Sequence, residues 1–152
     1  MTELFKKIGF GCDHAGFVYK EELKKWLGSK GYITKDYGVY NEKSLLDYKC
    51  VANLAMGIVL NEVDVGIAIC GTGVAVSIVA NKTKGIRAAL CNDIFTAKKS
   101  RQHNDANVLA LGSRVIGLEY AKEIVEAWLS AEFEGGRHAE RRKYFSFLDD
   151  LR

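Results

Sequence analysis

The chain has 152 residues, of which 48% are hydrophobic and 27% charged, and it carries a formal net charge of +3. That length is the usual size of one domain and buries about 70% of the unfolded surface, so we expect a single domain over residues 1–152. The composition excludes disordered and fibrous proteins, and no apolar run approaches the roughly 20 residues that cross a bilayer, so no membrane association is expected.

The N-terminal segment, MTELFKKIGFG, passes from two lysines directly into a short apolar stretch. A secretion signal would need a longer apolar core at this place. The cysteines Cys12, Cys50, Cys70 and Cys91 include no C-x-x-C pair, so they form neither a disulfide framework nor a zinc-ribbon spacing. We therefore expect reduced thiols and a cytoplasmic location.

Short β-rich runs alternate with helical patterns along the chain. These runs are continuously apolar more often than strictly alternating, which is typical of parallel strands covered by helices on both faces. The pattern predicts an α/β fold, a three-layer sandwich around a five-stranded parallel, Rossmann-like sheet. The expected strands are KIGFGC (7–12), YITKDY (32–37), DVGIAIC (64–70), IRAALC (86–91) and NVLALG (107–112).

Apolar residues spaced three and four apart predict the helices that cover the sheet. After a last turn at Gly135 and Gly136, a further apolar stripe predicts an extra C-terminal helix. That stripe could pack on the domain itself or on a second subunit, and both remain open. The covering stripes are Val51, Leu54, Ala55, Ile58 and Val59, and Ala121, Ile124, Val125, Trp128 and Leu129; the C-terminal stripe is Tyr144, Phe145, Leu148 and Leu151.

Polar segments follow four of the expected strands. Because ligands of open parallel sheets bind beyond the carboxyl ends of the strands, these segments are the first candidates for a site. They would bring acid, base and anion-binding groups to one edge of the sheet. The segments are Cys12-Asp13-His14-Ala15-Gly16, Cys70-Gly71-Thr72-Gly73, Asn92-Asp93 and Gly112-Ser113-Arg114.

The segment ICGTGVAVSIVANK joins a buried strand to a helix through Gly71 and Gly73. Free main-chain N–H groups and the helix dipole make such a turn an anion site. A dinucleotide-binding fingerprint does not fit, because Val76 stands where glycine or alanine is needed and the turn follows the third strand. A Walker loop is excluded because no Gly-Lys-Ser/Thr follows.

A single cysteine is most often a small buried hydrophobe, and we interpret Cys12, Cys50 and Cys91 in this way. Cys70 differs, because a thiol between the carboxyl end of a strand and a helix N-terminus has its thiolate favoured by the dipole. Such a thiolate can act as a nucleophile or as a base that removes a proton.

The three histidines are His14, His103 and His138. His14, beside Asp13, and His103 are candidates for chemistry, whereas we expect a surface or hydrogen-bonded structural role for His138. None of them forms a histidine pair at i and i+4, so the sequence predicts no metal site.

The net positive charge lies in one short segment, residues 137–143. This segment contains Arg137, Arg141, Arg142 and Lys143 but a single acidic residue. Arg137 and Arg141 are four apart and share a helix face, an arrangement that suits a phosphate; a solvated helix start is the simpler alternative. A nucleic-acid partner is not expected, because the rest of the chain is neutral and its aromatic residues fall on core-like helix faces.

Four segments together resemble the ribose-5-phosphate isomerase type B family, which includes the galactose-6-phosphate and allose-6-phosphate isomerases. They are GCDHAG (11–16), ICGTGVAVSIVANKTKGIRAAL (69–90), SRQHNDANVLALGSR (100–114) and FEGGRHAERR (133–142). The resemblance covers nearly the whole chain with the motifs in the same order, so it is far more specific than one glycine loop.

The resemblance implies that Cys70 takes the proton from C2 of the open-chain sugar and that His103 opens the furanose ring. Thr72, with the main chain of residues 71–75, would stabilise the enediolate. The remaining residues would bind the substrate: Gly71, Gly73, Val74 and Ala75 at the turn, Asp13, His14 and Asn104 at the hydroxyls, Arg114, Arg137, Arg141 and again His14 at the phosphate, and Tyr48 in the pocket lining.

The resemblance also implies a homodimer or a dimer of dimers with sites shared between subunits, a small-molecule sugar phosphate as substrate, and neither cofactor nor metal. Aldose-ketose isomerisation agrees with this, because it needs a base, an oxyanion pocket and a phosphate handle. Two positions bear on substrate fit and on the base. Ala75 stands where the family usually has glycine, and Val76 stands where some members have a glutamate base.

Three functions remain open at this stage. The leading one is interconversion of ribose 5-phosphate and ribulose 5-phosphate, and the second is isomerisation of a six-carbon sugar phosphate. The third is a phosphate-binding module without catalysis, which would leave Cys70, His103 and Thr72 without a joint purpose.

Overall fold

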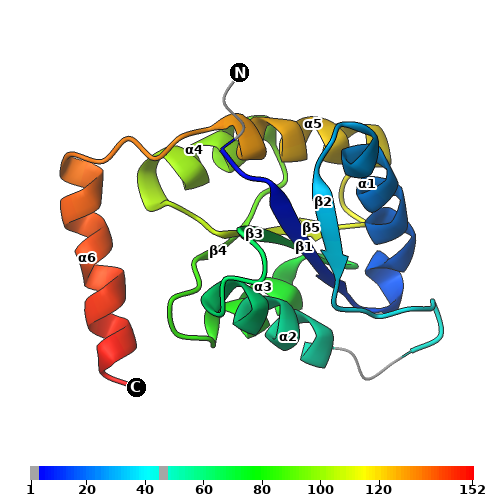
Figure 1. Ribbon diagram of the computed structural model, residues 1–152, viewed down its shortest axis with the longest axis horizontal. Helices are drawn as coiled ribbons and strands as arrows, with labels where there is room; N and C mark the ends of the chain where they lie inside the picture. The colour runs from blue at the N-terminus through cyan, green and yellow to red at the C-terminus, as the bar shows by residue number, and fades with distance from the viewer. Residues whose placement is uncertain (1–3, 45–47) are drawn as a thin grey trace.

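The computed structural model describes residues 4–44 and 48–152, and it forms a five-stranded, fully parallel sheet in the order β2-β1-β3-β5-β4 (Figure 1). The α/β fold and all five expected strands are confirmed, with ends trimmed by up to two residues. The strands are β1 (Lys7–Cys12), β2 (Ile33–Asp36), β3 (Val65–Cys70), β4 (Ala88–Leu90) and β5 (Val108–Gly112).

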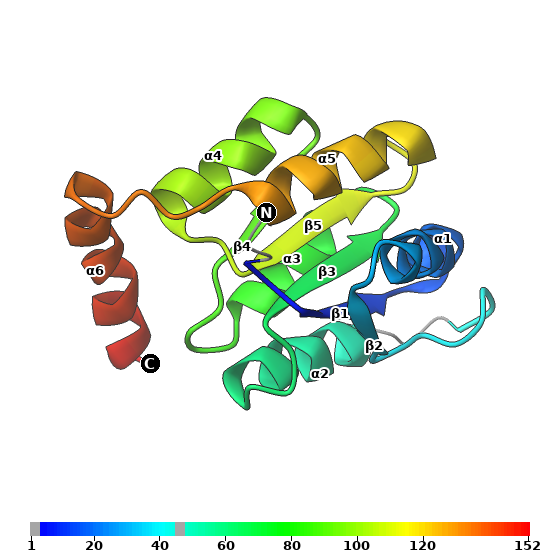
Figure 2. The same ribbon diagram turned by 45° about the horizontal axis from the view of Figure 1, so that its top comes forward.

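Helices cover both faces of the sheet and make the three layers (Figures 1 and 2). One face packs on α1, α4 and α5 around Phe10, Ile69 and Trp128. The other face packs on α2 and α3 around Leu54 and Val76. The helices are α1 (Phe17–Ser29), α2 (Tyr48–Val59), α3 (Val74–Asn81), α4 (Ile94–Asn104), α5 (Leu118–Ser130) and α6 (Arg137–Asp150), with a short 3-10 turn at His14–Gly16 before α1.

The apolar stripes that predicted α2 and α5 face the sheet. The stripe residues of α5 are all buried, and Val51, Leu54 and Ala55 of α2 are fully buried. Val59, the last residue of α2, is exposed because the chain leaves the sheet there. Among the described residues, none of the helices combines the length and the apolar character that a bilayer span requires.

The extra C-terminal helix is confirmed as α6, which projects from the body (Figure 2). Gly135 and Gly136, both with positive φ, form the turn before it. The end of α6 is tied to the turn after α3, because Asp149 accepts a hydrogen bond from the Gly85 main chain and Arg152 donates to the Asn81 carbonyl. The apolar stripe of α6 stays largely uncovered within one chain, with Tyr144 62% and Leu151 68% exposed.

Candidate active site

The turn after β3 holds a buried thiol against a helix N-terminus. Cys70 ends the strand and is 3% exposed. The Gly73 main-chain N–H donates a hydrogen bond to the Cys70 sulfur at 3.1 Å, and the Thr72 hydroxyl accepts one from the Val74 N–H at 3.2 Å. Since α3 begins at Val74, the N–H groups of its first turn, including that of half-buried Ala75, lack partners inside the helix and can bind an oxyanion.

Glycine is required at one place in this turn and at one place beside it. Gly73 has φ of +79°, a left-handed conformation, and a Cβ placed there would lie 2.4 Å from the Leu90 side chain. A Cβ on Gly112, at the end of the neighbouring strand β5, would lie 2.6 Å from the Thr72 carbonyl. The main chains of the two strand ends therefore approach each other closely beside the thiol.

Further polar groups surround the turn at the same edge of the sheet. One carboxylate oxygen of Asp13 accepts hydrogen bonds from the main chain of Ala15 and Gly16, which fixes the loop after β1. His14 and Arg114 line one hollow of about 390 Å³. The Arg114 guanidinium also lies over Gly71, since a Cβ on that glycine would be 3.3 Å from Nη1. We name Asp13, His14, Cys70, Thr72 and Arg114 the carboxyl-edge cluster.

A second group of polar side chains gathers where α4 ends and α6 begins. The His103 and His138 rings stack at 4.1 Å between centroids with an angle of 8° between their planes. One oxygen of Glu134 lies 3.8 Å from His103 Nε2 and 3.5 Å from His138 Nε2. With Asn104 and Arg141, the two histidines line a cavity of about 460 Å³. We name His103, Asn104, Glu134, Arg137, His138 and Arg141 the amino-edge cluster.

His138 is 7% exposed, and its ring contacts that of His103, a candidate catalytic residue. The sequence did not reveal this contact. Burial lowers its pKa, and the positive charges of neighbouring groups, among them Arg137, lower it further, whereas Glu134 acts in the opposite direction. His138 therefore favours the neutral imidazole. No spacing in the sequence signals this contact, because Glu134 precedes α6 and is separated from His138 by the Gly135-Gly136 turn, in which both glycines have positive φ.

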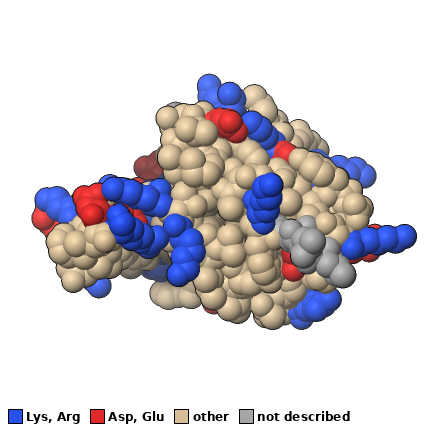
Figure 3. Space-filling model, turned by 90° about the horizontal axis from the view of Figure 1, so that it is seen from below, with Lys and Arg blue, Asp and Glu red and all other residues tan. Residues whose placement is uncertain are grey.

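The arginine side chains at the start of α6 point in two directions, as their spacing predicted. Arg142 turns toward the body, 3.6 Å from the Asp105 carboxylate and over the Phe133 ring. Arg137 and Arg141 are exposed, and within the described part of the chain neither forms an ion pair. Basic side chains gather on the projecting end of the molecule where α6 lies (Figure 3). Arg137 and Arg141 thus remain available for an anion from outside the chain.

The two clusters lie at opposite edges of the sheet. Cys70 pairs with Gly112 at the end of β5, whereas His103 lies in the last turn of α4, which ends shortly before β5 begins at Val108. The four steps along β5 correspond to roughly 13 Å at about 3.3 Å per residue. In Figure 2, α6 lies on the side opposite to the arrowheads of β3 and β5. Within one chain the structure does not bring Cys70 and His103 together.

Tyr48, an expected lining residue, begins α2 and is 46% exposed. It lines neither of the two hollows described above.

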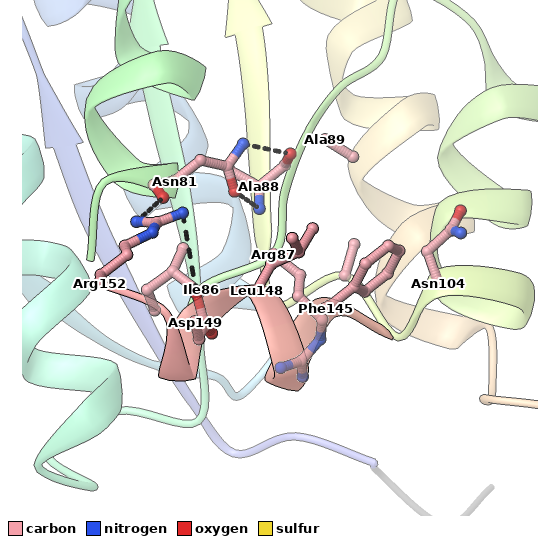
Figure 4. Close-up of a pocket in the computed structure, with 11 residues that line it drawn as sticks. Asn81, Ile86, Arg87, Ala88, Ala89, Asn104, Phe145, Leu148, Asp149 and Arg152 are labelled. Atoms are coloured by element: carbon pink, nitrogen blue, oxygen red, sulfur yellow. Dashed lines mark hydrogen bonds and ion pairs between the residues drawn. The ribbon is translucent and has the colours of Figure 1, made fainter. Parts of the chain in front are cut away.

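A separate cavity of about 350 Å³ lies between α6 and the body (Figure 4). Phe145 and Leu148 of α6 face it from one side, and Ile86 and Arg87 face it from the other. The C-terminal stripe was predicted to pack either on the domain or on a second subunit. Two of its residues, Phe145 and Leu148, face the domain, and the other two, Tyr144 and Leu151, remain exposed.

Comparisons with known proteins agree over nearly the full length. Residues 8–144 match the model of the family described as Ribose/Galactose Isomerase. The chain is 50% identical over 148 residues to ribose-5-phosphate isomerase B of Escherichia coli, covering 97% of this chain and 99% of the relative. It is 45% identical to D-erythrulose-4-phosphate isomerase of Pectobacterium atrosepticum, covering 93% and 94%. The solved structure of Clostridium thermocellum ribose-5-phosphate isomerase B superposes with a TM-score of 0.93 at 46% identity, covering 95% and 98%.

Proposed function

The chain belongs to the ribose/galactose isomerase family, and from this premise we propose that it is an aldose-ketose isomerase that interconverts ribose 5-phosphate and ribulose 5-phosphate. The observation that carries the proposal is the Cys70 thiol, buried at a strand end and facing the start of α3. A base and an oxyanion site then lie side by side, as enediolate chemistry requires.

In the proposed reaction, the Cys70 thiolate removes the proton from C2 of the open-chain aldose. The electron pair moves toward C1, and the oxygen of the former aldehyde becomes the enediolate oxygen. Thr72 and the N–H groups of residues 71–75 stabilise that charge. The thiol then returns the proton to C1, and transfer of the hydroxyl proton between the two oxygens completes the ketose. No step needs a redox cofactor or a metal.

We assign ring opening to His103 and phosphate binding to Arg137 and Arg141. Asp13, His14 and Asn104 would contact hydroxyls, and Arg114 would reach the phosphate from the carboxyl edge. The two clusters lie at opposite edges of one sheet, so one chain cannot place both around one small sugar. We therefore propose that each site combines the carboxyl-edge cluster of one subunit with the amino-edge cluster of another.

The uncovered stripe of α6 supports this assembly. Tyr144, Phe147 and Leu151 are exposed within one chain, and a row of large apolar side chains is typical of a subunit interface. The helix that carries Arg137 and Arg141 would then be held against the neighbouring subunit. We propose a homodimer or a dimer of dimers, located in the cytoplasm, where the four free thiols stay reduced.

The test is an isomerase assay of the purified protein with aldose phosphates of four, five and six carbons. We expect ribose 5-phosphate to give the highest kcat/KM. Turnover confined to a six-carbon substrate would favour the alternative activity. Phosphate binding without turnover of any substrate would contradict the proposed enzyme.

A further inference from the structure

Three side chains that can bind metals converge at the start of α6. The Nε2 atoms of His103 and His138 lie 3.8 and 3.5 Å from the same carboxylate oxygen of Glu134. One ligand atom from each residue lies within 4.8 Å of the other two. Among residues 4–44 and 48–152, no other group of three histidine, cysteine or acidic side chains has that geometry.

We propose that His103, Glu134 and His138 form a binding site for a zinc ion, and that zinc bound there inhibits the isomerase. Inhibition rests on the proposed function, because it follows from occupying His103, the residue assigned to ring opening. Two imidazole nitrogens and one carboxylate oxygen are a ligand set that zinc accepts at about 2.0–2.2 Å. A fourth position would remain open toward the cavity that His103 and Arg141 also line.

The nitrogen ligands favour zinc over magnesium or calcium, which prefer oxygen. His138 is positioned for this role by its stack on His103, which places its Nε2 atom 3.5 Å from the Glu134 carboxylate. Glu134 supplies the negative charge, and its main-chain N–H donates to the Gln102 carbonyl at 2.9 Å, which holds it beside the end of α4.

Two features limit the affinity. The rings are nearly parallel, so their nitrogen lone pairs must tilt toward a common point when the ion enters. The exposed guanidinium groups of Arg137 and Arg141 repel a cation, whereas Arg142 is already paired with Asp105. The site therefore suits reversible inhibition by added metal.

Binding is tested first, without reference to activity. Zinc affinity is measured by competition with a chromogenic chelator for the wild type, Glu134→Gln, His138→Gln and the matched control Glu132→Gln, which alters an exposed carboxylate outside the cluster. We expect one ion per chain, an affinity lowered at least about tenfold by either cluster substitution, and no change in the control. Cys70→Ala should still bind zinc, which separates this site from a thiol site. Equal affinity in Glu134→Gln and the wild type, or loss of binding in Cys70→Ala alone, would overturn the proposal.

Inhibition is tested next with ribose 5-phosphate. Chelation of the purified enzyme should leave its rate unchanged, added zinc should lower the rate, and chelator should restore it. The ratio of rates without and with zinc should fall toward one in Glu134→Gln and stay at the wild-type value in Glu132→Gln. Zinc bound at the cluster with no loss of rate would refute the inhibitory part. A protein that binds zinc at the cluster but isomerises no sugar phosphate would instead refute the proposed function.

Discussion

The main chain of Gly73 donates a hydrogen bond to the sulfur of Cys70 at 3.1 Å. An N–H directed at a thiolate stabilises its charge, and the same bond fixes the sulfur beside the first turn of α3. The proposed base and the proposed enediolate site are therefore positioned by one short segment, the turn from β3 into α3.

Replacing Cys70 by alanine should lower kcat by about 10³-fold or more, because the base is removed while the anion-binding N–H groups remain. Binding of inorganic phosphate, measured by calorimetry, should change little. Cys91→Ala is the matched control, since Cys91 is also buried at a strand end but belongs to the core on the opposite face of the sheet. Near-normal turnover in Cys70→Ala would contradict the assigned role.

Gly73→Ala should impair both stability and activity. The new Cβ would clash with the Leu90 side chain and with the peptide bond between Leu111 and Gly112. The alanine would also have to adopt a φ of +79°. A left-handed conformation costs a residue with a side chain roughly 1–2 kcal/mol, and the contact adds to it. The free energy of unfolding, measured in urea, and kcat should both decrease. Gly117→Ala is the control, because its Cβ would meet no atom within 4 Å. Equal stability of the two variants would show that the turn tolerates a side chain.

The sequence predicts the carboxyl-edge cluster better than the amino-edge cluster for a physical reason. Cys70, Thr72 and Gly73 are neighbours in the chain, and the rule that ligands bind at strand ends places them without further information. The stack of His103 on His138 depends on how the Gly135-Gly136 turn returns the chain to α4, and no local pattern encodes that path. The site residues assigned by resemblance remain predictions for the experiments described here.

The burial of Lys20 was also hidden from the sequence. A lysine in an amphipathic helix normally lies on the solvated face, yet Lys20 is fully buried. Its ammonium binds both oxygens of Asp36 at 2.8 and 2.9 Å and also the Val39 carbonyl. Burial alone would raise the pKa of Asp36, but the hydrogen bonds from Lys20 and Lys24 lower it. The pair therefore ties α1 to the end of β2, and the bond to Val39 ties it to the loop that follows.

Asp36→Ala should destabilise the protein by about 3–5 kcal/mol, because it leaves the buried Lys20 charge without its hydrogen-bonded carboxylate, the remaining acidic neighbour being Glu21 at 3.6 Å. Lys20→Met should cost less, since Asp36 keeps its ion pair with Lys24 at 2.6 Å. Glu126→Ala, which removes the exposed pair with Lys30, should cost about 1 kcal/mol or less. Free energies of unfolding in urea provide the comparison. A similar small loss in Asp36→Ala and Glu126→Ala would contradict this account.

Stability should fall as the pH drops below the ordinary histidine value of 6.5, because the pKa of His138 is lowered in the folded chain. The unfolded chain then binds the proton at a higher pH than the folded chain does. Stabilisation from the neutral ring is complete above 6.5 and is lost as the pH falls through the lower, folded pKa. As the pH is lowered from about 7.5 to 5, the melting temperature should fall less in His138→Asn than in the wild type. Identical declines would mean that His138 does not titrate differently in the two states.

Subunit exchange tests the shared site directly. Cys70→Ala and His103→Ala proteins should each be inactive alone, but mixed and allowed to exchange they should form dimers with one intact site. In a hybrid, the site that joins Cys70 of one subunit to His103 of the other is wholly wild type, whereas the second site carries both substitutions. Random exchange makes about half of the dimers hybrids, each with one working site of two, so activity should recover to roughly a quarter of the wild-type value. Mass measurement of differently tagged subunits shows independently whether exchange has occurred. Complete exchange without recovered activity would contradict the shared site.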